Sequence, residues 1–172
     1  MANKNGFTLV ELLVVVAVIS ITMSIGLPSF QSTIASTRLT SAANAMVSAL
    51  QLARSEALKQ QKTVFVIKKT KWENGWDIFV DSKVPANKKQ DLPDEPTFAT
   101  FDLLSSTITV PYGTGKGTYL NYVSYSANGS ANSGHFIFCS SSDFRSVVIS
   151  STGRIRVDTS SNSTITYTTS GC

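Results

Sequence analysis

The sequence contains few charged residues and little of the chemistry that enzymes use. Charged side chains make up 15% of its 172 residues, against about 25% in an average soluble protein, so Ser, Thr and Asn must supply much of the polar surface. It has one histidine, His135, and two cysteines. These three residues do not make a convincing metal site, which needs three or four ligands, and no pattern indicates a catalytic triad. We therefore expect no enzyme activity, no metal and no cofactor.

Two short stretches lack the spacing of known ligand-binding loops. GTGKG at 113–117 does not match the G-x-x-x-x-G-K-[ST] pattern of a phosphate-binding loop, so it indicates a turn. DLPDE at 91–95 lacks the alternating oxygen ligands of a calcium loop. The net charge of +4 and the isoelectric point of about 9.1 are mildly basic. They do not by themselves imply a nucleic-acid partner.

The two cysteines, Cys139 and Cys172, suggest a disulfide, because Cys172 stands at the end of the sequence. A disulfide there would hold a tail that otherwise frays. Closing a loop of about thirty residues stabilises a fold by about 3–4 kcal/mol. This pairing requires an oxidising compartment. The alternative is two unrelated free thiols.

An apolar segment runs from Phe7 to Leu27, and Glu11 is its only charged residue. At 1.5 Å per residue these 21 or so residues measure roughly 30 Å, the thickness of the hydrocarbon core of a bilayer. A secretory signal peptide fits poorly, because the run is too long and no small-x-small cleavage site follows it. A plain membrane anchor leaves Glu11 unexplained, since a carboxylate at the bilayer centre costs about 2.5–3.5 kcal/mol. An acid that snorkels to the interface is the remaining alternative.

The stretch GFTLVELLVVVAVISI at 6–21 resembles the class III signal of type IV pilins and type II secretion pseudopilins. The resemblance implies that prepilin peptidase cuts between Gly6 and Phe7 and that the new amine of Phe7 is methylated. It also implies that Glu11 pairs with the N-terminal amine of a neighbouring subunit during assembly. Such a pair would offset the cost of the buried charge.

Hydrophobic periodicity predicts one long helix, followed by a β domain. Pro28 would kink the helix. Beyond it, apolar residues recur every three or four positions and predict an amphipathic helix that packs on a globular domain: Leu39, Ala43, Met46, Leu50, Ala53 and Ala57. We assign 1–6 to a leader, 7–27 to a transmembrane and assembly helix, 28–62 to the amphipathic helix and 63–172 to the β domain.

Short apolar runs separated by Gly, Ser and Asn turns predict an antiparallel β-sheet from residue 63 onward. TVFVIKK at 63–69 and WDIFVD at 76–81 read as its first hairpin. Further strands are expected at STITVPY (106–112) and in the tail after residue 160. The two tryptophans near the first hairpin either pack at its edge or form a platform for a sugar or a base. The expected fold class is α+β, a pilin fold in which the long helix packs on an antiparallel sheet.

Four pieces of the chain together resemble the GspH/FimT family: LQLARSEALKQ, WENGWDIFVD, a cysteine-bearing strand and STGRIRV. Its members are minor pilins of type IV pili and the minor pseudopilin H of type II secretion. The resemblance implies a minor pilin that helps prime or cap a filament, with the secretion pseudopilin as the alternative. Its implied partners are major and minor pilins, prepilin peptidase and the inner-membrane assembly platform. Its implied location is a single-pass inner-membrane anchor with the globular domain in the periplasm, and then the pilus.

The stretch SVVISSTGRIRVD at 146–158 predicts a hairpin with its turn at 151–153. Strand alternation places Arg154 and Arg156 on one face, about 7 Å apart, which matches the phosphate spacing of a nucleic-acid strand. The stretch resembles the G-R-x-R motif of FimT-type pilins that bind DNA. It implies double-stranded DNA binding in natural transformation by Gly153, Arg154 and Arg156, with Arg145 as a further candidate. The alternative is a solvated edge strand that its arginines guard against pairing.

Overall fold

The structure, a computed structural model, describes residues 6–82, 90, 94–102, 104–111, 119–140 and 143–159, without the side chains of 25–29. The chain divides into two compact units, Met1–Ser36 and Thr37–Cys172. Cys172 and the expected last strand after residue 160 lie outside the described residues. The disulfide between Cys139 and Cys172 therefore stays a prediction.

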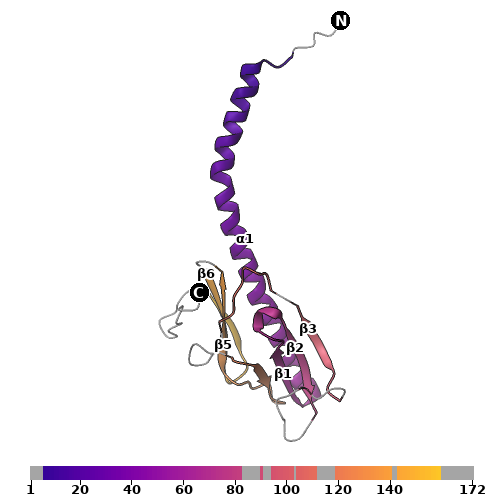
Figure 1. Cartoon of the computed structure of the whole chain (residues 1–172). Helices are drawn as coiled ribbons and strands as arrows, with labels where there is room; N and C mark the ends of the chain where they lie inside the picture. Colours follow the sequence, from indigo (N-terminus) through magenta and orange to yellow (C-terminus); the bar gives the residue numbers. More distant parts are fainter. Residues whose placement is uncertain are drawn as a thin grey trace. The chain divides into compact units, whose positions relative to one another are not determined.

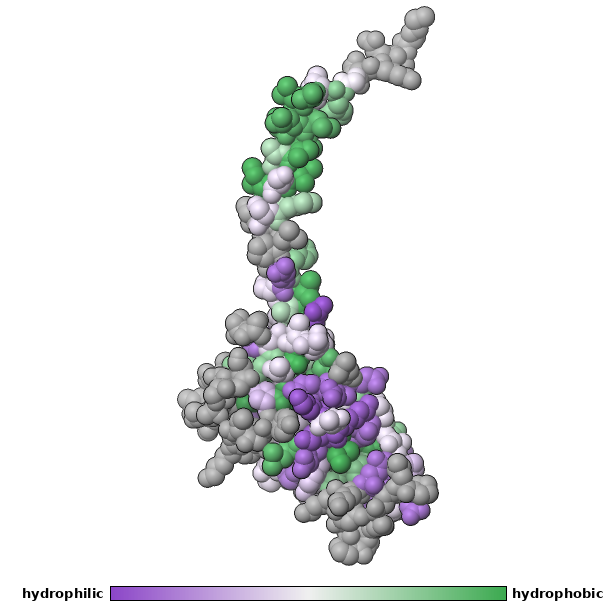
Figure 2. All heavy atoms as spheres, viewed as in Figure 1, coloured by the Kyte–Doolittle hydropathy of each residue, from purple (hydrophilic) through white to green (hydrophobic). Residues whose placement is uncertain are grey.

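Helix α1, Leu9–Gln60, contains 52 residues and passes through residue 28 without a break (Figure 1). Pro28 therefore does not end the helix, and the predicted kink stays a prediction. In the first unit the large apolar side chains of α1 are exposed, for example Leu9 at 79% and Ile21 at 62%. Figure 2 shows these apolar side chains gathered along the first turns of the helix. In the part of the chain that the structure describes, no helix carries an apolar stretch long enough to cross a membrane.

The first sheet of the second unit has four antiparallel strands in the order β3-β2-β1-β4. The strands are β1 (Thr63–Lys68), β2 (Trp76–Asp81), β3 (Thr97–Phe101) and β4 (Tyr122–Tyr125). The predicted first hairpin is confirmed, since β1 pairs with β2 over its whole length, from Thr63↔Asp81 to Lys68↔Trp76. A short 3-10 helix, η1 (Trp72–Asn74), lies in the connection between them.

The second sheet has three antiparallel strands in the order β5-β6-β7. The strands are β5 (Gly134–Ser140), β6 (Asp143–Ile149) and β7 (Ile155–Asp158). The antiparallel β domain is thus confirmed, with the addition that it is divided into two sheets. The strand expected at 106–112 contributes one isolated bridge among its described residues, Thr109 with Cys139. Pro111 offers no N–H for a ladder, so the pairing cannot extend beyond Thr109 in that direction.

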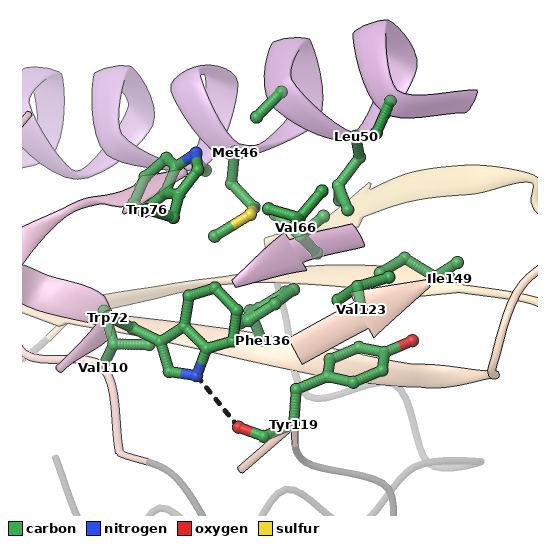
Figure 3. Close-up of a cluster of buried hydrophobic side chains, with 14 of the residues drawn as sticks. Met46, Leu50, Val66, Trp72, Trp76, Val110, Tyr119, Val123, Phe136 and Ile149 are labelled. Atoms are coloured by element: carbon green, nitrogen blue, oxygen red, sulfur yellow. Dashed lines mark hydrogen bonds between the residues drawn. The ribbon is translucent and has the colours of Figure 1, made fainter. Parts of the chain in front are cut away.

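The core of the second unit lies where α1 meets both sheets (Figure 3). The predicted apolar stripe of α1 is confirmed, because all six of its residues, from Leu39 to Ala57, are at most 1% exposed. Trp72 and Trp76 are both fully buried. Trp72 donates from Nε1 to the carbonyl oxygen of Tyr119 at 3.0 Å. The two indoles therefore belong to the core and form no exposed platform for a sugar or a base.

Candidate functional site

The predicted assembly segment begins with a capping box at the start of α1. Thr8 precedes the first helical residue, and its carbonyl oxygen accepts from the N–H of Leu12 at 3.2 Å. The Glu11 carboxylate accepts from the backbone N–H of Thr8 and from its hydroxyl, both at 3.0 Å. In return the Thr8 hydroxyl accepts from the Glu11 N–H at 3.2 Å. Two backbone donors that the helix leaves unpaired are satisfied in this way.

This arrangement gives Glu11 a partner within its own chain. The carboxylate also lies at the positive end of the helix dipole, where negative charge is stabilised. Gly6 and Phe7, the predicted cleavage residues, precede the helix and are exposed, with Phe7 at 81%. Both residues of the predicted cleavage site are therefore accessible in the separate chain. The T-x-x-E signature is readable in the sequence, and our sequence analysis missed it.

The second candidate site is the hairpin of β6 and β7, which is present as predicted. Ile149 pairs with Ile155, and Ser146 pairs with Asp158. The turn is closed by the Gly153 N–H, which donates to the Ser150 carbonyl at 2.8 Å, and by the Ser150 N–H, which donates to the Arg154 carbonyl at 3.0 Å. These bonds fix the position from which the arginines extend.

Gly153 has a structural role that its place in the motif does not reveal. Its φ is +77°, and a Cβ built there would meet the carbonyl oxygen of Gly129 at a distance shorter than any real contact. The same Cβ would lie 3.2 Å from Cε1 of Tyr125 and 3.1 Å from Nε of Arg54. Only glycine fits both the backbone angle and the space.

Arg54, within the ARSEA stretch of α1, connects the helix to two turns. Its Nε donates to the Gly129 carbonyl at 3.2 Å, and its Nη2 donates to the Thr152 carbonyl at 3.0 Å. ARSEA and STGRIRV, two of the stretches that resemble the GspH/FimT family, are far apart in the sequence and meet at this contact. Sequence reasoning gave no signal for this contact, because it depends on the tertiary arrangement.

Arg154 and Arg156 lie on one side of the hairpin, as alternation predicts. Together with Val148, Ser150 and Thr152 they line a hollow of about 210 Å³. Arg156 donates from Nε to the Asp158 carboxylate at 3.1 Å. Arg154 is exposed, and its guanidinium has no hydrogen bond or ion pair among the described residues. One arginine is therefore free to bind an anion, and the other shares its charge with an acid.

Arg145 does not join this surface. The register pairs Val148 with Arg156 and Ser146 with Asp158, so Arg145 points to the opposite face of the sheet. Its Nη1 lies 2.9 Å from the Asp143 carboxylate and 2.8 Å from the Phe144 carbonyl oxygen, and its side chain is only 15% exposed. The expectation that Arg145 adds to the Arg154 and Arg156 surface is therefore corrected.

The other chemistry-bearing residues are buried in the second sheet. His135 is 8% exposed, and this burial lowers the pKa of its imidazole. Cys139 is 2% exposed. Within the described ranges, no cluster of three or more His, Cys, Asp or Glu residues could hold a metal ion.

Comparison with known proteins gives two family matches. The model described as Type II transport protein GspH matches residues 42–153. The model described as Prokaryotic N-terminal methylation motif matches residues 1–27. Among curated proteins, no sequence matches the chain significantly.

Solved structures with the same fold include two pilin-type proteins. The type IV minor pilin FimU of Pseudomonas aeruginosa superposes with a TM-score of 0.57 at 24% identity, over 73% of this chain and 92% of FimU. A second crystal form of FimU gives a TM-score of 0.55. The minor pseudopilin EpsH from the type II secretion system of Vibrio cholerae gives 0.51 at 11% identity, over 73% of this chain and 99% of EpsH.

These matches confirm the expected family and the expected fold. The two neighbours are named as pilin-type subunits and not as enzymes. The GspH model covers more than half of the chain, and the methylation motif covers the segment in which Gly6, Phe7 and Glu11 stand. The chain belongs to the GspH family and is a minor pilin or pseudopilin of the GspH/FimT type.

Proposed function

We propose that the chain is a minor pilin of a type IV pilus, which enters the filament through its N-terminal helix and helps to prime or cap it. The observation that carries the proposal is Glu11, the only acid in an exposed apolar segment that matches the methylation motif. In a bilayer this carboxylate costs about 2.5–3.5 kcal/mol. Pairing with the amine of a neighbouring subunit offsets that cost and favours assembly.

The proposed route begins in the inner membrane, where residues 7–27 anchor the chain and the globular unit lies in the periplasm. Prepilin peptidase removes residues 1–6 and methylates the amine of Phe7. The assembly platform then brings the chain together with major and minor pilins. The mass of the mature protein tests the first step, because it should correspond to a methylated Phe7. A mature start near residue 28 would contradict the proposal.

The capping box makes it possible to separate the charge of Glu11 from its local hydrogen bonds. Glu11→Gln removes the charge and keeps a residue that completes a capping box. Thr8→Ala keeps the charge and removes the cap. If pairing with a neighbouring amine drives assembly, Glu11→Gln should insert into the membrane at the normal level and be depleted at least tenfold from purified filaments. Thr8→Ala should remain in them.

The opposite pattern, with Glu11→Gln assembled and Thr8→Ala absent, would assign Glu11 to helix capping alone. The alternative machine, type II secretion, uses the same assembly chemistry, so a deletion strain must decide between them. Loss of surface pili with normal protein secretion supports the pilus. Loss of secretion with normal pili supports the pseudopilin.

A second candidate function, binding of double-stranded DNA for natural transformation, is favoured by the hollow beside Arg154 and Arg156. The hydroxyl-bearing residues Ser150 and Thr152 line the same hollow, so guanidinium and hydroxyl donors stand together. Phosphate contacts carry no base information, so binding should be independent of sequence. Affinity should fall as salt rises, because counterions are released.

The ion pair between Arg156 and Asp158 allows the DNA-binding test to include one variant that should bind more tightly as well as one that should bind more weakly. Changing Arg154 and Arg156 to Ala together should lower the slope of log K against log salt by about 2. Asp158→Asn should raise affinity, because it releases Arg156 from its partner. Lys71→Ala, at an exposed lysine outside the hairpin, is the matched control. Binding that responds equally to all three changes would assign these arginines to a solvated face.

A further inference from the structure

Strand β5 is buried on both of its faces. Phe136 and Phe138 point into the core between α1 and the sheets, and Figure 3 shows Phe136 there. Successive side chains of a strand alternate between its faces, so His135, Ile137 and Cys139 point away from that core. They are nevertheless only 8%, 4% and 2% exposed. An antiparallel sheet that turned this outer face to water would leave such residues exposed, so another layer covers the outer face.

The strand register extends this outer face across the second sheet. Ile137 pairs with Ser146, and Ser146 pairs with Asp158 on β7. Cys139 pairs with Phe144. Paired residues point to the same face, and Ser146 is fully buried there. We call the apolar part of this face, formed by Ile137, Cys139 and Phe144, the outer patch.

The described hydrophobic neighbours of the outer patch border it and do not cover it. Within the described ranges, Phe144 is the hydrophobic side chain that packs against Ile137 and Cys139, and it stands on the neighbouring strand of the same sheet. The segment around Thr109 meets Cys139 through backbone hydrogen bonds, beside β5 and not above it. The exposed fractions are those of a single chain. The covering layer therefore comes from another part of the same chain.

The C-terminal segment 160–172 fits this role by its starting point and its length. Strand β7 ends at Asp158, which lies two strands from Ile137 in the same row of the sheet. Neighbouring strands are about 4.8 Å apart, so the segment starts about 10 Å from β5. Its 13 residues reach about 40 Å when extended. It can therefore cross the outer patch and still bring Cys172 back to Cys139, as the predicted disulfide requires.

The composition of the same segment fits an apolar sheet face. In TITYTT at 164–169, Ile165 and Tyr167 alternate with threonines, a pattern that favours an extended chain with one apolar side. Residues 160–172 carry no charged side chain, so no charge would be buried against the outer patch. The connection 83–93 is also long, but it carries three lysines and Asp91, and it follows β2 of the other sheet.

We propose that the outer face of the second sheet is the docking site of the chain's own C-terminal segment, which lies across the outer patch with Ile165 and Tyr167 against it. Apolar contact holds the segment there, and the predicted disulfide ties its end. The inference is independent of the proposed function. It bears on the second candidate function, because Val148 and Arg156 of the same face also line the hollow beside Arg154. The docked segment would border that hollow.

The reactivity of Cys139 tests the docking, because its thiol belongs to the outer patch. Cys172→Ser leaves Cys139 as the only thiol and removes the disulfide. In the full chain in detergent micelles, we expect iodoacetamide to alkylate Cys139 slowly in this variant. Adding Ile165→Ser and Tyr167→Ser should speed the reaction at least tenfold. The matched control adds Thr164→Ala and Thr166→Ala, on the other side of the extended segment, and should stay slow.

The other outcomes of this experiment overturn the proposal. Fast alkylation in Cys172→Ser itself, with a cooperative melt retained, would show that apolar contact does not hold the segment on the outer face. Slow alkylation in all three chains would show that the cover does not depend on Ile165 and Tyr167. Equal acceleration by the serine and alanine changes would show that neither side of the segment is specific for the outer patch.

Disulfide trapping gives an answer even where the serine changes impair folding. In the Cys172→Ser chain, Tyr167→Cys places a thiol on the side of the segment that should meet the outer patch, and Thr166→Cys places one on the other side. Under mild oxidation we expect Tyr167→Cys to form a disulfide with Cys139 at least fivefold faster than Thr166→Cys. Equal rates, or no disulfide in either chain, contradict the docking. The second result would fit a segment that pairs with the free edge of β7 instead.

Discussion

In the assembly that we propose, the carboxylate of Glu11 has two partners at different stages. In the separate chain it accepts hydrogen bonds from Thr8 and completes a capping box. In the proposed filament it faces the amine of a neighbouring subunit. Before assembly, the two hydrogen bonds from Thr8 lower the free-energy cost of placing the Glu11 carboxylate in an apolar environment. They replace part of the hydration that the carboxylate loses there. They also hold the oxygen atoms at the helix start, where a neighbouring amine would reach them.

Gly153 is the residue whose replacement should be most damaging to the hairpin. Gly153→Ala forces a Cβ onto a backbone with φ of +77° and against the Gly129 carbonyl. We expect the free energy of unfolding to fall by about 1–3 kcal/mol or more, measured by denaturant titration. Ser151→Ala, at an exposed position in the same turn, should change it by less than about 0.5 kcal/mol. Equal stability of the two variants would show that the turn relaxes around the added methyl group.

His135 should make the second unit less stable in mild acid. Burial lowers the pKa of His135 in the folded chain, so the unfolded chain binds the proton more readily. Stability from this group is complete above its unfolded pKa of about 6.5 and is lost as pH falls below that value. Because His135 is the only histidine, His135→Gln should flatten the change in unfolding free energy between pH 7.5 and pH 5.5. An unchanged slope would contradict this assignment.

Glu56 marks a separate range of pH. The hydrogen bond from Gln60 lowers the pKa of Glu56. The stability that Glu56 contributes is therefore present at any pH above the ordinary pKa of a glutamate, and it is lost as the pH falls through the lowered pKa of the folded chain. The two groups can therefore be distinguished by pH alone.

At the scale of elements, the sequence predicted what depends on local pattern. The stripe from Leu39 to Ala57 and the hairpin of β1 and β2 follow from periodicity, and both are present. The division into two sheets was not predicted, because strand alternation does not say which strand lies beside which. Only the tertiary structure shows that the segment around Thr109 meets β5 at a single bridge.

The candidate sites divide in the same way. The shared side of Arg154 and Arg156 follows from alternation along an extended segment, at the start of β7. Arg145 stands on the neighbouring strand, and its face depends on the register between β6 and β7. The contact of Arg54 with both turns depends on how α1 crosses the β domain. Neither of these last two relations can be read from spacing along the chain.

Arg54 should therefore contribute to stability through contact between elements. Arg54→Met keeps the apolar stem and removes the bonds to the Gly129 and Thr152 carbonyls. We expect a loss of about 1.5–3 kcal/mol in the free energy of unfolding, the usual range for hydrogen bonds to a charged group. Arg38→Met, on the same helix but without a described partner, should leave stability within about 0.5 kcal/mol. A similar loss in both variants would point to helix propensity and not to the contact.

At the scale of the whole molecule, the division at residue 36 predicts that the second unit folds without the first. The hydrophobic core begins at Leu39, and no residue of the first unit belongs to it. A chain that begins at Ile34 should therefore melt cooperatively, with a midpoint within about 4 °C of the full chain, since less than about 1 kcal/mol is at stake. A chain that begins at Gln51 is the control. It lacks three fully buried side chains, those of Leu39, Met46 and Leu50. The loss of each costs about 2–5 kcal/mol, and the sum is as large as the free energy of unfolding of a typical domain. Circular dichroism should show no cooperative thermal transition for the chain that begins at Gln51. A broad, non-cooperative melt of the chain that begins at Ile34 would contradict the prediction, because it would mean that the first unit takes part in folding the second.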